Sequence, residues 1–274
     1  MPELPELEVV RIAIGPKLEG RTVEAVEVNP RKGFILRAPL PAFASEPKGR
    51  DIVHTWRRGK HLIFDLESPA GDCAHLVINP MLGGRFHLTD AKTKRGAALI
   101  FALRLDDGRE LRYLDFRDMG RVYWVHDLEK EVPAWPDLGP EADSLPENGL
   151  EWFRKRLRRY RAAIKDVLRD QAFLAGIGNA YSDEILFEAR ILPLRRRSSL
   201  KPDDEEALFD AINTVLPKSI AAVLASPAYI DAKQDRSFMN VHGKGSQACP
   251  RCGHRISQIG SDREPMNFCR GCQY

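Results

Sequence analysis

The last 26 residues of the chain hold four of its five cysteines in two matched pairs. Cys249 and Cys252 form one CxxC pair, Cys269 and Cys272 form the other, and 16 residues separate the two pairs. Each pair can place two thiolates on a tight turn, and two such turns complete a tetrahedral zinc site without an open coordination position. We therefore expect one structural zinc ion. Two CxxC disulfides or four free thiols are the alternatives.

The second residue of the chain can supply a nucleophile. Pro2 follows the initiator methionine, which is usually removed before a small residue, and removal exposes a secondary amine next to Glu3. An α-amino group has a pKa of about 8, so part of it is neutral near pH 7. Neutral amines of this kind form Schiff bases with sugar or carbonyl carbons. The alternative is that Pro2 only begins a helix.

Two further features suit phosphate groups. A basic run follows Leu150 and consists of Arg154, Lys155, Arg156, Arg158, Arg159, Arg161, Lys165 and Arg169. A stripe of one charge sign suits a phosphate backbone, although most charge runs are solvated surfaces. Downstream, Gly176, Gly178 and Asn179 share a short turn, where glycines permit close backbone approach and the amide can donate a hydrogen bond. An ordinary turn between helices is the alternative.

Short strands should position the N-terminal residues. From Thr22 to about His126, β-branched and aromatic runs alternate with turn residues, which predicts a sandwich or a partly open barrel. The pair Asp107-Gly108 accepts the positive φ values of a tight hairpin, so the runs on either side of it should pair antiparallel. Prolines punctuate residues 127–149, and we interpret this stretch as a linker.

Helices should position the basic run and the glycine turn. Apolar residues recur every three to four positions from Leu150, and we expect them to form one buried helical face: Phe153, Leu157, Ile164 and Leu168. A later helix should open at Pro202, followed by four acidic residues, and Pro217 should kink it.

Composition limits the class of protein. The chain has 274 residues, 43% hydrophobic and 30% charged, which indicates about two domains of an ordinary globular protein. The net charge of +3 is too small to identify a partner. No uninterrupted apolar run approaches the roughly 18 residues of a membrane span, and the acidic N-terminus is unlike a signal peptide. We expect an intracellular protein without a disulfide framework.

Four blocks of the sequence together resemble the bacterial formamidopyrimidine-DNA glycosylase and endonuclease VIII family. Residues 2–8 (PELPELE) resemble the family's N-terminal signature, and residues 58–62 (RGKHL) resemble its lysine hairpin. Residues 176–187 (GIGNAYSDEILF) resemble its helix-two-turn-helix motif, and the four cysteines match its C-terminal zinc finger. The blocks occur in the family's order over the whole chain.

The resemblance implies an α+β fold in which an N-terminal helix and a β-sandwich precede a helical helix-two-turn-helix domain with a C-terminal zinc-finger hairpin. The expected domains are residues 1–126, a linker at 127–149, the helix-two-turn-helix domain at 150–240 and the zinc finger at 241–274. The implied partner is damaged double-stranded DNA, bound by a single chain without a membrane. The implied cofactor is one structural zinc ion.

The resemblance also implies roles for individual residues. Pro2 would attack the sugar C1′ of a flipped nucleotide, and Glu3 would move protons at the sugar ring. Lys60 would hold the phosphate next to the lesion, and Asn179 would hold another phosphate. The expected reaction is excision of oxidised bases, with oxidised purines such as formamidopyrimidine or 8-oxoguanine favoured, followed by cleavage at the abasic site. A preference for oxidised pyrimidines or abasic sites, or a non-catalytic zinc DNA-binding protein, are the alternatives.

Three departures from the family affect the DNA contacts. Glu264 stands where the zinc hairpin usually carries an arginine, and Arg263 one residue earlier is the candidate replacement. The gap left by the flipped base would be filled by Met81, from a segment with three extra residues, by Arg117 and by Met119 in place of a phenylalanine. Met119 as a core residue is the alternative. Asp118 replaces a second arginine, and the segment 226–238 is short for a loop that caps 8-oxoguanine.

Overall fold

The computed structural model describes residues 2–146, 149–226, 235–261 and 264–274. Within these residues the chain divides into two compact units. The first unit contains residues 2–136 and 223–226, and the second contains 137–146, 149–222, 235–261 and 264–274. The mixed α+β class and the order of elements expected from the sequence are confirmed.

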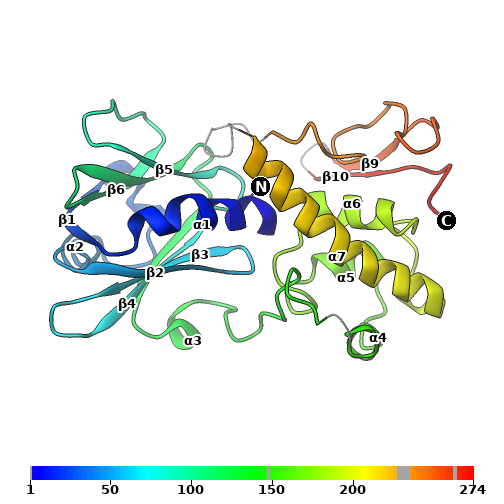
Figure 1. Ribbon diagram of the computed structural model, residues 1–274, viewed down its shortest axis with the longest axis horizontal. Coiled ribbons are helices and arrows are strands. Elements are labelled where there is room, and N and C mark those ends of the chain that lie inside the picture. Colours follow the sequence, from blue (N-terminus) through cyan, green and yellow to red (C-terminus); the bar gives the residue numbers. More distant parts are fainter. Residues whose placement is uncertain (1, 147–148, 227–234, 262–263) are drawn as a thin grey trace. The chain divides into compact units, whose positions relative to one another are not determined.

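The first unit is built from helices around a set of antiparallel strands (Figure 1). Its helical elements are α1 (Leu4–Leu18), the 3₁₀ helix η1 (Pro30–Ile35), α2 (Leu40–Ser45) and α3 (Leu128–Glu131). Its strands are β1 (Arg21–Val28), β2 (Asp51–Arg58), β3 (His61–Glu67), β4 (Cys73–Asn79), β5 (Gly84–Asp90), β6 (Leu99–Leu105), β7 (Arg109–Asp115) and β8 (Arg121–Val125).

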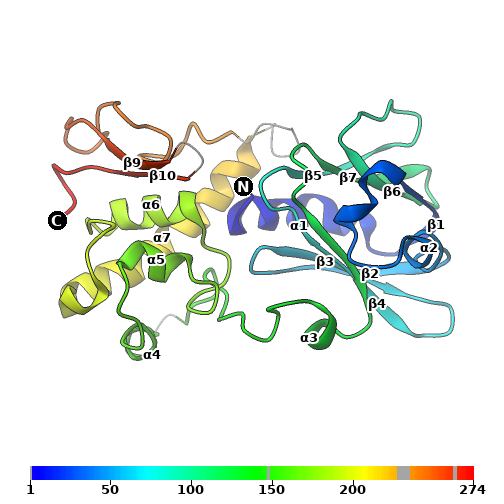
Figure 2. The ribbon, with the colours of Figure 1, turned by 180° about the vertical axis from the view of Figure 1, so that it is seen from behind.

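The eight strands pair in the order β5-β7-β6-β1-β2-β3-β4-β8. Strand β1 joins the two halves, because Arg21 and Thr22 pair with β2 and the residues from Val23 onward pair with β6. The pairing with β6 contains a register shift between Val23 and Ala25, directly after the change of partner strand. Figure 2 shows the β5-β7-β6 half and the β2-β3-β4 half of the unit from behind. The β-sandwich predicted from the sequence is therefore confirmed.

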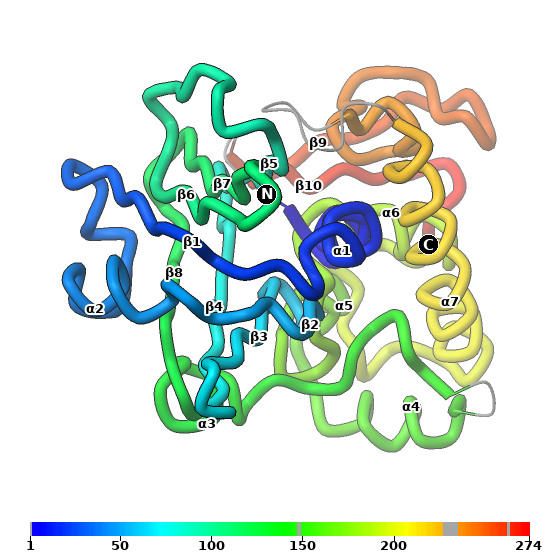
Figure 3. The backbone as a smooth tube through the Cα atoms, turned by 60° about the vertical axis from the view of Figure 1, so that its left-hand side comes forward, coloured from blue at the N-terminus to red at the C-terminus, as the bar shows by residue number. Residues whose placement is uncertain are grey.

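Apolar side chains from both halves and from α1 fill the core of the first unit. Leu7, Val10, Ile14 and Leu18 recur along one side of α1, and all four are buried. Helix α1 lies against β2 (Figure 3). Their contact is close, because a Cβ on Gly15 would lie 3.2 Å from the Cβ of Thr55. Packing on the sheet thus fixes the helix that begins just after Pro2 and Glu3.

Two tight hairpins follow the sequence expectations. Strands β6 and β7 pair antiparallel, and Gly108 has φ 83°, so the predicted hairpin at Asp107-Gly108 is confirmed. Strands β2 and β3 pair from Asp51 opposite Glu67 to Arg58 opposite His61. This pairing leaves a two-residue turn at Gly59-Lys60, where Gly59 has φ 54° as the first position of such turns requires.

The second unit is mostly helical. Its elements are α4 (Leu150–Leu157), α5 (Ile164–Arg169), α6 (Asn179–Glu188), the 3₁₀ helix η2 (Arg197–Ser199), α7 (Pro202–Ala225, with its last residues in the first unit), β9 (Ser257–Ser261) and β10 (Glu264–Phe268). Strands β9 and β10 form an antiparallel hairpin. Helix α7 continues through Pro217 as one element.

The sequence predicted one continuous helical face from Phe153 to Leu168. This prediction is wrong, because the four residues lie on two separate helices. All four predicted apolar residues are buried, but α4 ends at Leu157 and α5 begins at Ile164. Between the two helices the backbone pairs with another segment, because Arg197 N–H donates to the Ala162 carbonyl and Ile164 N–H to the Arg195 carbonyl. These hydrogen bonds satisfy the backbone without a continuous helix.

The sequence analysis found no run long enough to span a membrane, but helix α7 passes a test of length and composition for such a span. By length and composition alone it could cross a membrane, since an 18-residue window has a mean hydropathy of 1.4. One such helix is weak support for a span, because the core helix of a folded domain passes the same test. Here Leu208, Ile212 and Leu216 are fully buried and so belong to a protein core.

Candidate functional site

The N-terminal turn of α1 buries both residues predicted to carry the chemistry. Pro2 is buried, and Glu3 is 1% exposed at the N-cap of the helix. The backbone N–H of Glu3 donates to the Glu6 carboxylate at 2.8 Å, which is half of a capping box. Pro2 also lines a cavity of about 10 Å³, room for about one water molecule, together with Gly84 and Phe86.

Lys60 lies on the turn between β2 and β3. The neighbouring Arg57 donates from Nη1 to the carbonyl of Gly59 at 3.2 Å and from Nε to Glu8 of α1 at 3.1 Å. The turn that carries Lys60 is thereby connected to the helix that begins after Glu3. No sequence pattern indicated this role for Arg57, because the pairing joins residues 49 positions apart.

The loop with Arg117 and Met119 is organised by a single carboxylate. Asp115 is fully buried, and its two oxygens accept backbone N–H groups from four successive residues. The donors are Arg117 at 2.9 Å, Asp118 at 3.0 Å, Met119 at 2.9 Å and Gly120 at 2.6 Å. Because its lone pairs are used inside the loop, Asp115 fixes the backbone from which Arg117 and Met119 project. Sequence reasoning missed this residue.

Met119 is 44% exposed, so its interpretation as a core residue is wrong. The neighbouring Asp118 has φ 55° and forms an ion pair with Lys32 of η1. The acidic residue that departs from the family pattern therefore has a cationic partner in this structure.

The segment with Met81 lies beside the Asp115 loop. The Phe116 N–H donates to the Gly83 carbonyl at 3.2 Å, and a Cβ on Gly83 would lie 2.4 Å from the Asp115 carboxylate. Met81 has φ 45°, and its N–H donates to the side chain of Asn79 at 3.1 Å. The structure thus brings the Met81 segment together with the loop of Arg117 and Met119.

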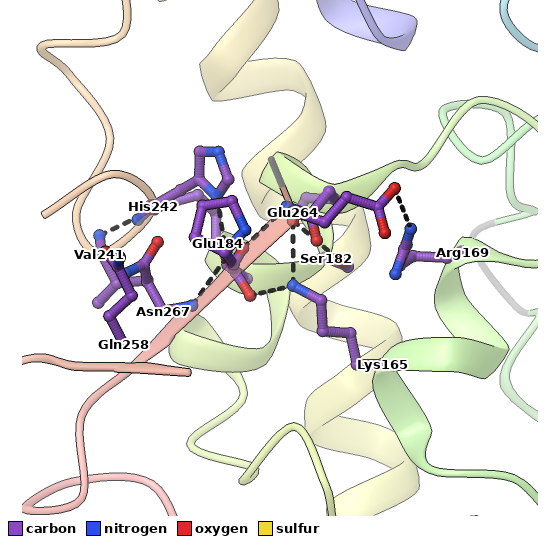
Figure 4. A network of polar contacts seen from close by, with 12 residues as sticks. Lys165, Arg169, Ser182, Glu184, Val241, His242, Gln258, Glu264 and Asn267 are labelled. Atoms are coloured by element: carbon purple, nitrogen blue, oxygen red, sulfur yellow. Dashed lines mark hydrogen bonds and ion pairs between the residues drawn. The ribbon is translucent and has the colours of Figure 1, made fainter. Parts of the chain in front are cut away.

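Asn179 begins α6 in the second unit, directly after Gly178. Its side-chain nitrogen donates to the Pro265 carbonyl of β10 at 2.8 Å, and its own carbonyl accepts from the buried Lys165 ammonium at 3.2 Å. Lys165, which Figure 4 labels, also pairs with the buried Asp183. Two contacts therefore hold the residue predicted to bind a phosphate.

Asp183 and Glu184 connect α6 to the segment that precedes the cysteine hairpin. Figure 4 labels Glu184 together with Val241 and His242 of that segment. Asp183 accepts from the His242 ring at 2.8 Å and from the Asn267 N–H at 3.1 Å. Glu184 accepts the backbone N–H groups of three successive residues, 240–242, at 2.8 to 2.9 Å. Because these two buried carboxylates accept several backbone N–H groups, they fix the backbone of residues 240–242 and of Asn267 relative to α6.

The basic run is only partly a solvated or phosphate-facing surface. Arg154 pairs with Glu151 and Glu205, and Arg156 donates to the carbonyls of Phe173 and Ala172. Other members are Lys155, Arg158, Arg159 and Arg161, all of which are exposed. The predicted stripe therefore divides into structural cations and a smaller exposed set.

The four predicted cysteines meet at one point. Their sulfur atoms all lie within 4.8 Å of one another, with Cys249 and Cys272 at 3.8 Å and Cys252 and Cys269 at 3.5 Å. None of the four forms a disulfide, so the disulfide alternative is not supported. A tetrahedron with metal–sulfur bonds of about 2.3 Å has sulfur–sulfur edges of about 3.8 Å, and these separations fit it.

The backbone favours a thiolate at one of the four sulfurs, that of Cys249, whereas burial and hydrogen bonds with neighbouring cysteines raise the pKa of Cys269 and bring that of Cys272 to about 12. Burial raises the pKa of Cys249, but backbone N–H groups of Arg251 and Cys252 that donate to its sulfur lower it, and the resulting pKa is about 7. This group of four cysteines could hold a metal ion. The donor set of four sulfurs is closed, which suits a structural metal.

The charged residues near the tip of the hairpin differ from the family pattern. Glu264 begins β10 and pairs with Arg169 of α5 at 3.4 Å. The candidate replacement Arg263 lies outside the described residues, as do Met1 and the centre of the segment 226–238.

An N-terminal helix on an antiparallel sandwich, followed by a helical unit with a four-cysteine hairpin, defines an α+β protein of two units. The family model for the formamidopyrimidine-DNA glycosylase N-terminal domain matches residues 1–122, and the model for the H2TH domain of the same enzymes matches residues 138–226. The chain therefore belongs to the formamidopyrimidine-DNA glycosylase family.

Relatives and solved structures agree with this assignment. The chain is 35% identical over 282 residues to the formamidopyrimidine-DNA glycosylase of Heliobacterium modesticaldum, with 100% of both chains covered. It is 38% identical over 293 residues to that of Thermomicrobium roseum, with 100% of this chain and 99% of the relative covered. The complex of Lactococcus lactis Fpg with DNA that contains an abasic site is similar at a TM-score of 0.86 and 28% identity, with 99% of each chain covered. A MutM complex with DNA containing carbocyclic 8-oxo-G is similar at 0.85 and 27%, with 100% of each covered.

Proposed function

We propose that this protein is a base-excision repair DNA glycosylase with abasic-site lyase activity that removes oxidised purines. The observation that carries the proposal is the pair Pro2-Glu3, buried at the start of α1 in a chain that matches glycosylases over its full length. Its relatives are formamidopyrimidine-DNA glycosylases, and similar structures hold DNA with an abasic site or a carbocyclic 8-oxo-G. Action on DNA implies an intracellular location, and a single chain is proposed as the active unit.

The proposed reaction begins with a nucleotide rotated out of the duplex, because a stacked base cannot be reached. After removal of Met1, the Pro2 nitrogen attacks the sugar C1′, the glycosidic bond breaks, and the base leaves with the bonding electron pair and takes up a proton. Glu3 then gives a proton to the sugar ring oxygen as the ring opens, which leaves an iminium between Pro2 and C1′. Loss of a proton from C2′ expels the 3′ phosphate, so the strand is cut, and water releases the enzyme.

The remaining predicted residues are proposed to hold the DNA. Lys60 binds the phosphate next to the lesion and Asn179 binds another phosphate, each from an element whose backbone is fixed. Met81, Arg117 and Met119 fill the gap left by the flipped nucleotide. The two methionines are suited to this because apolar side chains commonly separate stacked bases. Arg263 is proposed as an additional phosphate ligand from the hairpin.

The metal proposed for the cysteine cluster is zinc. Cys249, Cys252, Cys269 and Cys272 would hold it as four thiolates. Because the site has no open coordination position, the metal would only stabilise the fold of the hairpin, which has little apolar core of its own.

The test is a panel of duplexes, each with one lesion, incubated with the processed protein and with borohydride. Duplexes should include formamidopyrimidine, 8-oxoguanine, an oxidised pyrimidine and a bare abasic site, and undamaged duplex is the control. We expect cleavage and a trapped covalent complex with the oxidised purines and the abasic site. Faster cleavage at oxidised pyrimidines would replace the proposed lesion class. No trapping with any duplex would overturn the enzyme assignment in favour of a DNA-binding protein.

A further inference from the structure

A buried guanidinium joins the helix of Pro2 and Glu3 to the turn that carries Lys60. Arg57 stands near the end of β2, and its side chain is 5% exposed. Its Nε donates to the carboxylate of Glu8 at 3.1 Å, and its Nη1 donates to the carbonyl of Gly59 at 3.2 Å. One planar group thus contacts α1 on one side and the β2–β3 turn on the other.

The contact with α1 is electrostatically strong. Arg11 also donates to Glu8, at 3.0 Å from Nε and 2.6 Å from Nη2. Burial raises the pKa of Glu8, but the hydrogen bonds and charges of Arg11 and Arg57 outweigh it and bring the pKa below its ordinary value. Glu8 is therefore ionised at neutral pH, and loss of its charge would remove the carboxylate that both arginines contact.

The contact with the turn fixes a peptide plane. The Gly59 carbonyl belongs to the peptide bond that leads into Lys60, and Gly59 already holds the positive φ of a two-residue turn. A hydrogen bond to this carbonyl sets the direction in which the Lys60 side chain leaves the backbone. At the other end of α1, Glu19 accepts the Thr55 N–H at 2.9 Å, so β2 is attached to the helix at two points.

We propose that Arg57 is a positioning residue for the reaction, which sets the Lys60 ammonium relative to Pro2 and Glu3 through Glu8 and the Gly59 carbonyl. The inference rests on the proposed function, because it assumes that these three residues act on one nucleotide. Reacting groups must be held within fractions of an ångström, and a displacement of about 1 Å can cost about a hundredfold in rate. Arg57 needs no contact with DNA for this role.

The decisive variant is Arg57→Lys in the full chain. Lysine keeps the charge next to Glu8, but its single ammonium lacks the fork that reaches Glu8 and the Gly59 carbonyl together. We expect the single-turnover rate of strand cleavage on abasic-site DNA to fall by about tenfold to a hundredfold, with the affinity for that DNA nearly unchanged. The matched control is Arg50→Lys, because Arg50 is also largely buried and donates to the carboxylate and to the backbone carbonyl of Asp72, away from the turn. It should lose similar stability and keep its rate.

A double-mutant comparison separates positioning from general stability. If Arg57 acts through Lys60, then Arg57→Lys should have no further effect on the cleavage rate in a Lys60→Ala background. Equal effects in both backgrounds, or an unchanged rate in the single variant, would overturn the inference. If Arg57→Lys is too unstable to assay, Glu8→Gln should give a smaller rate loss that also disappears in the Lys60→Ala background. A wild-type protein that neither cleaves nor traps abasic DNA would instead refute the proposed function itself.

Discussion

The side chain of Asn179 donates a 2.8 Å hydrogen bond to the backbone carbonyl of Pro265. The first residue begins α6 and the second lies in β10 of the hairpin that brings the four cysteines together. The cysteine cluster and the residue proposed to bind a phosphate are therefore parts of one connected structure, in which Asp183 and Lys165 provide further contacts.

Loss of the metal should weaken DNA binding through this connection. We expect one zinc per chain by metal analysis. Cys269→Ser should lower DNA affinity by about tenfold or more while the N-terminal unit stays folded, because the hairpin depends on the metal for its fold. The control is Cys73→Ser, which removes the exposed cysteine outside the cluster and should change neither property. Carefully prepared protein without bound metal would contradict the prediction.

Glu3→Gln should separate the two reactions. Base excision should fall more severely than cleavage of a preformed abasic site, because only excision must break the glycosidic bond. Pro2→Gly keeps an amine and is expected to retain weak lyase activity, whereas a blocked amine or a retained Met1 should abolish borohydride trapping. Persistent trapping by the blocked protein would move the nucleophile to another residue, with Lys60 the next candidate.

Asp115→Asn should destabilise the first unit by about 2 kcal/mol or more, since an amide presents one oxygen where the carboxylate accepts four N–H groups. Chemical denaturation of the full chain measures the loss. Asp118→Asn is the matched control in the same loop, because its carboxylate is partly exposed and its ion pair with Lys32 should contribute less than about 1 kcal/mol. Similar losses in both variants would contradict the role given to Asp115.

Neutralising Arg158 and Arg159 together should lower affinity for all duplexes alike and reduce the salt slope by about two, since each phosphate that is no longer neutralised lowers the slope by about one. Both side chains are exposed. Arg156→Gln is the comparison, because the Arg156 guanidinium donates to the carbonyls of Phe173 and Ala172. Its loss should reduce the stability of the protein and leave the salt slope of DNA binding unchanged. An unchanged slope in the double variant would make this surface a solvated one.

Glu8 should make the first unit more stable at neutral than at acidic pH. Its pKa is lowered in the folded protein, so its stabilising contribution is fully present above the ordinary value of 4.5 and disappears as pH falls through the lower folded value. Denaturation curves of wild type and Glu8→Gln between pH 7 and pH 3 should therefore converge toward acid. A difference that does not depend on pH would show that the contact with Arg57 is not electrostatic in origin.

Local patterns predicted the elements that depend on local chemistry. The Asp107-Gly108 hairpin follows from turn geometry, and the cysteine cluster follows from the spacing of two CxxC pairs, so both could be predicted from the sequence. The break between α4 and α5 could not, because it depends on hydrogen bonds to residues more than 30 positions away. Lys165 shows the same limit, since a lysine in a basic run gives no sign that Asp183 will bury it.

Two residues that the sequence analysis did not single out, Asp115 and Arg57, hold other parts of the candidate site in place. Asp115 could have been suspected from an acidic residue at a strand end before a short loop ending in glycine, but its four donors required the structure. No local pattern marked Arg57, because its acidic partner Glu8 lies 49 positions earlier in the sequence, although its other partner Gly59 is close by. Side chains that fix other side chains in place are set by tertiary contacts, which periodicity does not record.

The left-handed backbone of Met81, with φ 45°, has a consequence for how this position can vary. A residue with a Cβ is disfavoured there by roughly 1 kcal/mol, whereas glycine adopts the conformation freely. The backbone conformation therefore favours glycine, and methionine supplies a side chain at this position at a cost in folding free energy. Backbone strain of this kind clusters at functional sites, where the surrounding structure holds it in place.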